Sequence, residues 1–239
     1  MNKKILSIYW CTMPRPGNFG DILSPLILGH YGYDVKHSDL VGADYICVGS
    51  IAKLATDKHT VLGSGIMSSY NKINPNANWR WVRGPITRDI VVSQGGNCPE
   101  ILGDPAMLLP RIINPKETKD HKIGIIPHYV DYEYVKETYP SYKTINLLDA
   151  DLDNVVKQIT DCEKIISSSL HGIIAAHAYG IPAAWAKFSD KLAGDDTKFF
   201  DHHTSVNLPC ELSTVENPKY TVPNFDDSEI HDFLSSGDF

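Results

Sequence analysis

The chain has 239 residues, with 22 Lys or Arg and 29 Asp or Glu, so its formal net charge is −7 at pH 7. An acidic chain without a basic stripe does not suit a nucleic-acid-binding protein, and we expect no nucleic-acid partner. No apolar run approaches the ~20 residues of a membrane span, so we expect no transmembrane segment.

The positions of the cysteines and histidines indicate whether the protein forms disulfides and whether it binds a metal. The five cysteines are scattered, and no two of them form a C-x-x-C pair. An odd number of such cysteines favours free thiols in a reducing cytoplasm over a disulfide framework or a zinc site. The ten histidines show no metal-ligand spacing such as H-E-x-x-H. We therefore expect a cytoplasmic protein without a metal.

The first half of the chain alternates between short apolar runs and helical patterns. Residues 3–10 predict a buried strand rather than a signal peptide, because the apolar run is short and no small-residue cleavage site follows it. A loop with Asn18 and Asp21 precedes the first helix, and Asp21 either caps this helix or faces a ligand. The later runs predict strands at 45–48, 60–62, 79–82 and 100–104, and helices at 86–92 and 106–109.

A change of composition divides the chain. Residues 110–121 are rich in proline and charge and lack apolar periodicity, which predicts a linker. The alternation then restarts, with strands expected at 122–126, 144–148 and 183–186 and helices at 134–138 and after Asp151. We therefore predict an α/β fold of two Rossmann-like domains that face each other across a cleft. The predicted units are an N-terminal domain (1–112), a linker (113–121), a C-terminal domain (122–223) and an acidic tail with a weak helix (224–239).

Residues 165–182 carry the pattern on which the functional prediction depends. An apolar run, three serines and a second apolar segment predict a buried strand, a tight turn and a short helix that ends at Gly180. Such a turn directs free N–H groups and the positive end of the helix dipole out of the sheet, which makes an anion site. The serines either cap the helix or bind a phosphate, and His171 is either a ligand or an ordinary surface histidine.

Two further turns lie at predicted strand ends. Arg83 precedes Gly84 at such an end, and its planar donor fork suits an anion. The segment Gly63-Ser-Gly-Ile-Met-Ser68 is a near miss to the dinucleotide fingerprint G-x-G-x-x-G, because Ser68 replaces the last glycine. We therefore expect no nicotinamide cofactor, but a tight turn with Ser64 beside the cleft.

Seven short motifs occur in the order and spacing typical of one family. Between about Tyr9 and Val206 the chain resembles the polysaccharide pyruvyl transferases, most closely their bacterial exopolysaccharide ketal-pyruvyltransferase branch. No single motif is diagnostic, but the set is fairly specific. The motifs are Asn18-Phe-Gly-Asp21, Val82-Arg-Gly-Pro-Ile-Thr-Arg88, Leu102-Gly-Asp-Pro105, Ile125-Ile-Pro-His-Tyr-Val-Asp131, Ser167-Ser-Ser-Leu-His-Gly172, Gly180-Ile-Pro182 and Lys198-Phe-Phe-Asp201.

This resemblance implies a fold like the two-domain glycosyltransferases of the B type. It implies phosphoenolpyruvate as donor substrate, no cofactor, and a sugar of a polysaccharide or lipid-linked oligosaccharide as acceptor, on which a pyruvate ketal forms. The acceptor then lies on the side of the N-terminal domain and the donor on the side of the C-terminal domain. The implied location is the cytoplasm, either free or in peripheral contact with the inner face of the membrane.

The resemblance also implies roles for individual residues. The family's phosphoenolpyruvate-binding arginine and histidine fall on Arg83 and His171. We expect His171 to act as the acid, Asp21 as the base for the attacking hydroxyl, and Arg83 to hold an anionic end of the donor. The predicted donor-binding residues are Arg83, Ser168, Ser169, His171, Gly172, Lys187 and Lys198. The predicted acceptor and cleft residues are Asn18, Gly20, Asp21, Ser64 and His128.

One departure from the family keeps alternatives open. Many members have Arg directly before Leu-His-Gly, where this chain has Ser169. The missing charge then comes from Lys187, Lys191 or Lys198, or the chain is a non-catalytic glycan-binding member. A nucleotide-sugar glycosyltransferase is the other alternative, although the segment between Glu163 and Glu211 has no pair of glutamates. The acceptor sugar, the bridged hydroxyls, the ketal stereochemistry and the oligomeric state stay open.

Overall fold

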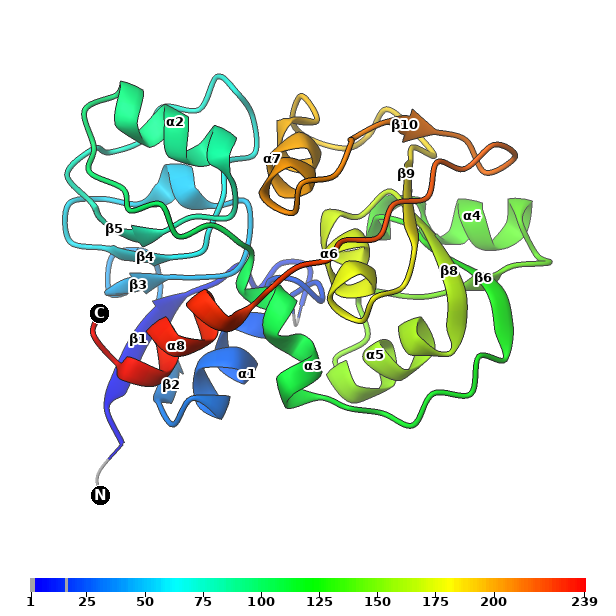
Figure 1. The fold of residues 1–239 in the computed structure, drawn as a ribbon, viewed down its shortest axis with the longest axis horizontal. Helices are drawn as coiled ribbons and strands as arrows, with labels where there is room; N and C mark the ends of the chain where they lie inside the picture. The colour runs from blue at the N-terminus through cyan, green and yellow to red at the C-terminus, as the bar shows by residue number, and fades with distance from the viewer. Residues whose placement is uncertain (1–2, 16) are drawn as a thin grey trace.

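Two parallel five-stranded sheets form the framework of the molecule (Figure 1). The computed structural model describes residues 3–15 and 17–239. Helices pack on the sheets, so the structure is α/β and is consistent with a two-domain Rossmann-like fold.

The first sheet has the strand order β2-β1-β3-β4-β5. Its strands are β1 (Ile5–Tyr9), β2 (Asp34–His37), β3 (Tyr45–Ile46), β4 (Thr60–Leu62) and β5 (Asn78–Trp81). The helices of this half are α1 (Leu23–His30), η1 (Ala52–Leu54), α2 (Pro85–Ser93), η2 (Pro105–Leu108) and α3 (Leu109–Ile112). The local signals for α2 are confirmed, because Pro85 occupies its first turn and Gly95 follows its end with φ +91°.

The second sheet has the order β10-β9-β8-β6-β7. Its strands are β6 (His121–Ile126), β7 (Lys143–Thr144), β8 (Cys162–Ser167), β9 (Ala183–Ala186) and β10 (Leu212–Ser213). The helices after β6 are η3 (Tyr129–Asp131), α4 (Tyr132–Thr138), α5 (Leu152–Thr160), α6 (Leu170–Ala178), α7 (Thr197–Ser205) and α8 (Ser228–Ser236). The predicted Asp151 cap of α5 is confirmed, since its side chain accepts a hydrogen bond from the Asn154 N–H at 3.0 Å.

Both sheets have the same topology. Counted from the first strand of each half, the order is 2-1-3-4-5 in both cases. The order therefore reverses between β1 and β3 in one sheet and between β6 and β8 in the other. Ligands of open α/β sheets bind at the carboxyl ends of the strands beside such a reversal. The loops after β1, β6 and β8 are thus the expected places for a site.

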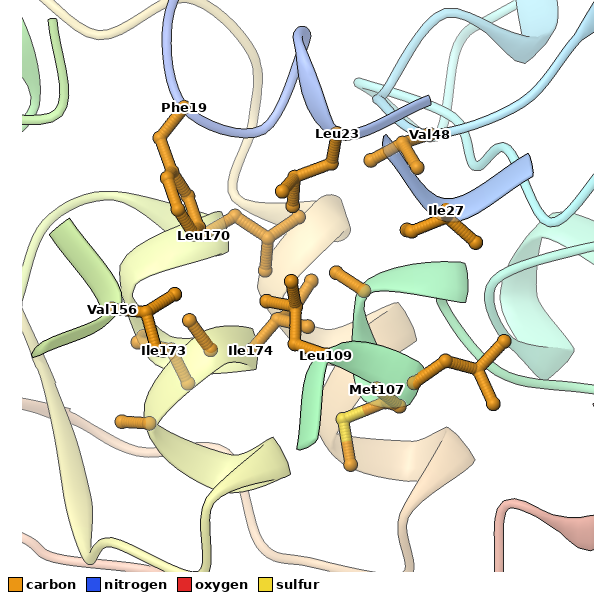
Figure 2. Close-up of a cluster of buried hydrophobic side chains, with 14 of the residues drawn as sticks. Phe19, Leu23, Ile27, Val48, Met107, Leu109, Val156, Leu170, Ile173 and Ile174 are labelled. Carbon is orange, nitrogen blue, oxygen red and sulfur yellow. The ribbon is translucent and has the colours of Figure 1, made fainter. Parts of the chain in front are cut away.

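One buried hydrophobic cluster spans both halves, and each half also has a smaller cluster of its own. Phe19, Leu23 and Ile27 from the first half belong to the same buried cluster as Leu170 and Ile174 of α6. Figure 2 shows these side chains converging between the ribbons of the two halves. The halves are therefore joined by an apolar interface and not only by the connecting segment.

The C-terminal segment returns to the first half, where α8 lies beside β1, β2 and α1 (Figure 1). Lys4 Nζ donates to the Phe239 carbonyl at 2.9 Å, and Tyr33 Oη donates to the Leu234 carbonyl at 3.1 Å. The predicted acidic tail thus forms the helix α8, and its residues contact the first half of the chain. Across the described parts of the chain, none of the helices has the length and apolarity needed to cross a bilayer.

Some predicted elements differ from the structure. The run at 100–104 forms only an isolated parallel bridge, between Val82 and Leu102. The sequence analysis did not predict β2 (Asp34–His37), which has a single apolar residue, Val35, and is partly exposed at the sheet edge. It also left α7 without a helical assignment. These elements carry weak apolar patterns, because they are short or lie at an edge.

Candidate active site

A cavity of about 90 Å³ lies between the two halves, at the carboxyl ends of the strands. The loop after β1 and the loops after β6 and β8 all contribute to its wall, as the strand-order reversals predict. From the first half, the lining residues are Asn18, Asp21, Ser50 and Met67. From the second half, they are His128, Tyr129, Leu147, Ser169, Leu170, His171 and Lys198.

The structure brings together only part of the predicted set. The predicted residues that line the cavity are Asn18, Asp21, His128, Ser169, His171 and Lys198. The predicted residues outside the lining are Gly20, Ser64, Arg83, Ser168, Gly172 and Lys187. Most residues of this second group still contact the lining residues or support the turns that carry them.

Asp21 faces the cavity instead of capping α1. The cap position of α1 is Ile22, and no side chain caps the helix. The Asp21 carboxylate instead accepts a hydrogen bond from the side-chain amide of Asn18, whose own oxygen accepts from the Gly20 N–H at 3.1 Å. Burial raises the pKa of Asp21 to about 6, although the nearby His171 charge and the Asn18 bonds act in the opposite direction. Such a carboxyl group is suited to accept a proton near neutral pH.

His171 is buried in the first turn of α6, so the alternative of an ordinary surface histidine is wrong. Its ring packs directly on Gly20, where a Cβ atom would lie 2.0 Å from the ring Nδ1. Its Nε2 lies 3.6 Å from Oδ2 of Asp104. The absence of a side chain at Gly20 therefore leaves the space that the imidazole occupies.

The three serines of the β8–α6 turn have different contacts. Ser167 Oγ accepts from the Ser169 N–H at 3.0 Å, and Ser168 Oγ accepts from the His128 N–H at 2.8 Å. These two side chains stabilise the turn. Ser169 is the cap residue of α6 but makes no side-chain capping bond, and it lines the cavity. Its hydroxyl and the free N–H groups of the first helical turn thus lie on the side where an anion would bind.

Glycine and serine at two other predicted positions serve packing. A Cβ atom at Gly172 would lie 2.5 Å from Ser167 Oγ and 2.8 Å from a side-chain carbon of Ile126, so α6 approaches β6 closely here. Ser64 is buried, and its hydroxyl donates to the Gly49 carbonyl at 2.8 Å. Both residues therefore shape the backbone near the cavity without lining it.

Lys198 brings a positive charge to the cavity wall from the first turn of α7. The residue is 8% exposed, and its ammonium group lies 5.3 Å from the centre of the Phe199 ring. This group has no hydrogen-bond or ion-pair partner among the described residues. Burial, with the Arg83 charge as a smaller cause, lowers the pKa of Lys198 to about 8. By contrast, Lys187 pairs with Asp196 and does not line the cavity.

His128 adds a neutral polar group beside Lys198. Burial and the Lys198 charge lower the pKa of His128 to about 4, so its imidazole is uncharged at neutral pH. Its Nδ1 is buried without a partner in the described structure. A neutral ring of this kind can exchange hydrogen bonds with a ligand but does not compete with Lys198 for an anion.

Arg83 lies behind the cavity wall, not in it. The side chain is fully buried, and its Nε donates to Asp201 Oδ2 at 3.0 Å. Its two other nitrogens donate to Ser50 Oγ and to the Ile66 carbonyl, each at 2.7 Å. Asp201 of α7 also accepts from the Thr87 N–H at 2.8 Å. Arg83 therefore connects the two halves and orients Ser50, the residue that does line the cavity.

Several site residues received no role from the sequence. Ser50, Met67 and Leu147 are ordinary residue types at loop positions, so nothing in the local pattern distinguished them, and Leu170 stands in the quoted motif of residues 167–172 without an assigned role. Tyr129 and Asp201, in contrast, stand inside family motifs that the sequence analysis quoted, and the same is true of Asp104. In the described part of the chain, no group of three or more His, Cys, Asp or Glu side chains is placed to hold a metal ion.

The chain is similar in sequence to a viral and a bacterial protein. An uncharacterised protein of Acanthamoeba polyphaga mimivirus is 37% identical over 164 residues, which make up 65% of this chain and 57% of that protein. The succinoglycan biosynthesis protein ExoV of Rhizobium meliloti (strain 1021) is 27% identical over 209 residues, or 81% of this chain and 62% of that protein. The chain thus spans about three fifths of the length of these curated relatives.

No solved structure matches the chain. The family model for polysaccharide pyruvyl transferase matches residues 3–186, which is more than half of the sequence and includes the loops after β1, β6 and β8. The chain therefore belongs to the polysaccharide pyruvyl transferase family.

Proposed function

We propose that the protein transfers the pyruvyl group of phosphoenolpyruvate to two hydroxyls of a sugar, forming a pyruvate ketal and releasing phosphate. The acceptor in this proposal is a polysaccharide or a lipid-linked oligosaccharide. The observation that carries the proposal is the buried, unpaired Lys198 in the same cavity wall as His171 and the start of α6. Family membership supports the reaction type, and ExoV is a protein of polysaccharide biosynthesis by its name.

The donor would bind through its anionic ends. Lys198 offers a cation, and Ser169 and the first N–H groups of α6 offer hydrogen-bond donors. Lys198 would thus replace the arginine that many family members have at the position of Ser169. Family membership favours phosphoenolpyruvate over the glycosyltransferase alternative.

Proton transfer would then activate both reactants. His171 protonates C3 of the donor, so that C2 becomes electrophilic. Asp21 takes the proton of the attacking sugar hydroxyl, which bonds to C2. Phosphate leaves with its bridging oxygen, and a second hydroxyl closes the ketal and releases its proton. Arg83 supports this chemistry indirectly, because it holds Ser50 and, through Asp201, the helix that carries Lys198.

The proposal extends to architecture and location. Two parallel sheets of equal strand order, with a cavity between their carboxyl edges, support a glycosyltransferase-B-like arrangement. Donor binding on the second half and acceptor binding on the first half agree with the positions of Lys198 and Asp21. We place the reaction in the cytoplasm, where phosphoenolpyruvate is available, with a peripheral contact to the inner face of the membrane when the acceptor is lipid-linked.

Donor binding is the first test. Titration calorimetry with phosphoenolpyruvate should give saturable binding, and Lys198→Gln should weaken it about 10- to 100-fold, because a charged hydrogen bond is lost. Lys122→Gln is the matched control, since it removes one exposed charge near the amino end of β6. Binding of nucleotide sugars without binding of phosphoenolpyruvate would contradict the proposal.

Turnover is the second test. Phosphate release should require both phosphoenolpyruvate and a glycan acceptor from a panel of oligosaccharides. His171→Ala should reduce this rate about 100-fold or more if the imidazole transfers a proton. Glycan binding without phosphate release on any acceptor would support the non-catalytic alternative.

A further inference from the structure

Two buried atoms face each other behind the cavity without a hydrogen-bond partner. Oδ2 of Asp104 and Nε2 of His171 are 3.6 Å apart, and neither atom bonds to any other group in the described structure. Asp104 is fully buried, and His171 is nearly so. An unpaired carboxylate oxygen is costly in such surroundings, so a facing N–H group stabilises it strongly.

The carboxylate of Asp104 is held in place by its other oxygen. Oδ1 accepts a hydrogen bond from the Ala106 N–H at 2.9 Å, where Asp104 caps η2. Burial, with the Asp104 charge as a smaller cause, raises the pKa of the Cys47 thiol. Oδ2 of Asp104 has no hydrogen-bond partner in the described structure and remains available to the imidazole.

The imidazole is restrained from its other side as well. The backbone of Gly20 packs on the ring, closest to Nδ1. Asp104 and Gly20 belong to the first half of the chain, whereas His171 belongs to the second. The ring thus sits between a carboxylate and a backbone segment of the opposite half, and both restrict its rotation.

We propose that Asp104 is a positioning residue that accepts the Nε2–H of His171 and so determines its tautomer. The uncharged ring then carries its proton on Nε2 and leaves Nδ1, on the side of the Gly20–Asp21 loop, to exchange protons in the cavity. Carboxylate–histidine pairs act in this way in hydrolytic triads, where the carboxylate orients the imidazole without taking its proton. The catalytic consequence rests on the proposed function, but the tautomer does not.

The direct test is the nitrogen spectrum of His171. In protein labelled with ¹⁵N-histidine at pH 8.5, where an ordinary imidazole is neutral, the two-bond ¹⁵N–¹H correlations of His171 should show the Nε2–H tautomer. The signal is assigned by its loss in His171→Gln. In Asp104→Asn the amide NH₂ group would face Nε2, and the ring should change to the Nδ1–H tautomer.

Kinetics provide the second readout. Asp104→Asn should reduce turnover about 100- to 10,000-fold, as loss of the orienting carboxylate does in triads. Its dissociation constant for phosphoenolpyruvate should change less than about threefold, because Asp104 does not line the cavity. Asp161→Asn is the control, since this buried carboxylate contacts Thr118 and Lys157 and should change neither the tautomer nor turnover.

The outcomes separate this inference from the proposed function. An Nδ1–H tautomer in the wild-type protein, or an unchanged tautomer in a folded Asp104→Asn variant, overturns it. The wild-type spectrum is decisive even if the variant does not fold. If the tautomer is as expected while phosphoenolpyruvate neither binds nor reacts, the positioning role stands and only the proposed function fails.

Discussion

At the scale of single residues, Asp21 and Lys198 have pKa values displaced toward neutral pH within one cavity. The pKa of Asp21 is raised to about 6, and that of Lys198 is lowered to about 8, mainly because both groups are buried. A base must be ionised and a cationic ligand must be protonated to act. We therefore expect kcat/KM for the donor to rise with pH through about 6 and to fall above about 8.

A pH series from 5 to 9.5 at constant ionic strength checks this prediction. Lys198→Gln should remove the part of the high-pH decline that the Lys198 titration causes, together with much of the donor affinity. A profile that stays flat between pH 5 and 7 would exclude Asp21 as the base.

The raised pKa of Asp21 also affects the stability of the folded protein. Its folded pKa of about 6 lies above the value of 3.8 for an unperturbed aspartate. The folded state therefore binds the proton more tightly, and stability falls as the pH rises from about 4 to above 6. Asp21→Asn removes this penalty and should raise the unfolding free energy by on the order of 2 kcal/mol at pH 8.

Urea unfolding of both proteins at pH 4 and pH 8 measures this effect. The difference should shrink at pH 4, where the wild-type carboxyl group is largely protonated in the folded state. An Asp21→Asn variant that is less stable at pH 8 would show that its hydrogen bonds with Asn18 outweigh the cost of burying the charge.

Gly20 offers a test of how closely the loop approaches His171. A Cβ atom in Gly20→Ala would lie 2.0 Å from the ring Nδ1, so the imidazole must move. Turnover should fall about 100-fold, since a small displacement of a catalytic group has a large effect on rate. Gly29→Ala in α1 is the control, because its Cβ meets nothing within 4 Å and should leave turnover unchanged. Equal turnover of both variants would mean that the ring position is not critical.

At the scale of elements, α7 is attached to the first half by a buried polar network. Asp201 accepts hydrogen bonds from Arg83 Nε and from both the N–H and the hydroxyl of Thr87. Asp201→Ala leaves the Arg83 charge buried without its counter-ion, which costs roughly 3–5 kcal/mol of unfolding free energy. Lys198 is on the same helix, so donor affinity should fall as well.

Denaturant unfolding with an exposed ion pair as control checks this estimate. Nη2 of Arg88 lies 3.4 Å from Oε1 of Glu100, and the Glu100 side chain is 90% exposed. Glu100→Ala should change stability by less than about 1 kcal/mol, because such surface pairs contribute little. If the two variants lost similar stability, the network would not be a main attachment of α7.

At the scale of the whole molecule, the shared core predicts that both halves unfold together. Ile174 is fully buried in the cluster that joins α6 to α1 and α3 (Figure 2). Ile174→Ala should lower the unfolding free energy by about 2–5 kcal/mol and still give one calorimetric transition. Two separate transitions in the wild-type protein would mean that each half is stable on its own.

Much of the fold is predictable because its signals are local. Pro85 and Gly95 bracket α2, Asp151 caps α5, and Gly180 follows α6 with φ +66°. Buried runs such as Ile165-Ile166 indicate central parallel strands. The edge strand β2 has a weak apolar pattern, so the sequence did not predict it.

The candidate site was predictable only where a residue stands in a strand-to-helix turn. The amino-acid sequence alone determined the βα alternation, the family motifs and the turns that carry Asp21 and His171. Only the tertiary structure decided that Arg83 pairs with Asp201 behind the cavity, that Lys198 remains unpaired within it, and that Asp104 faces His171. The physical reason is that turns and caps depend on neighbouring residues, whereas these partners are far apart in the chain and meet only when the two halves pack on a common core.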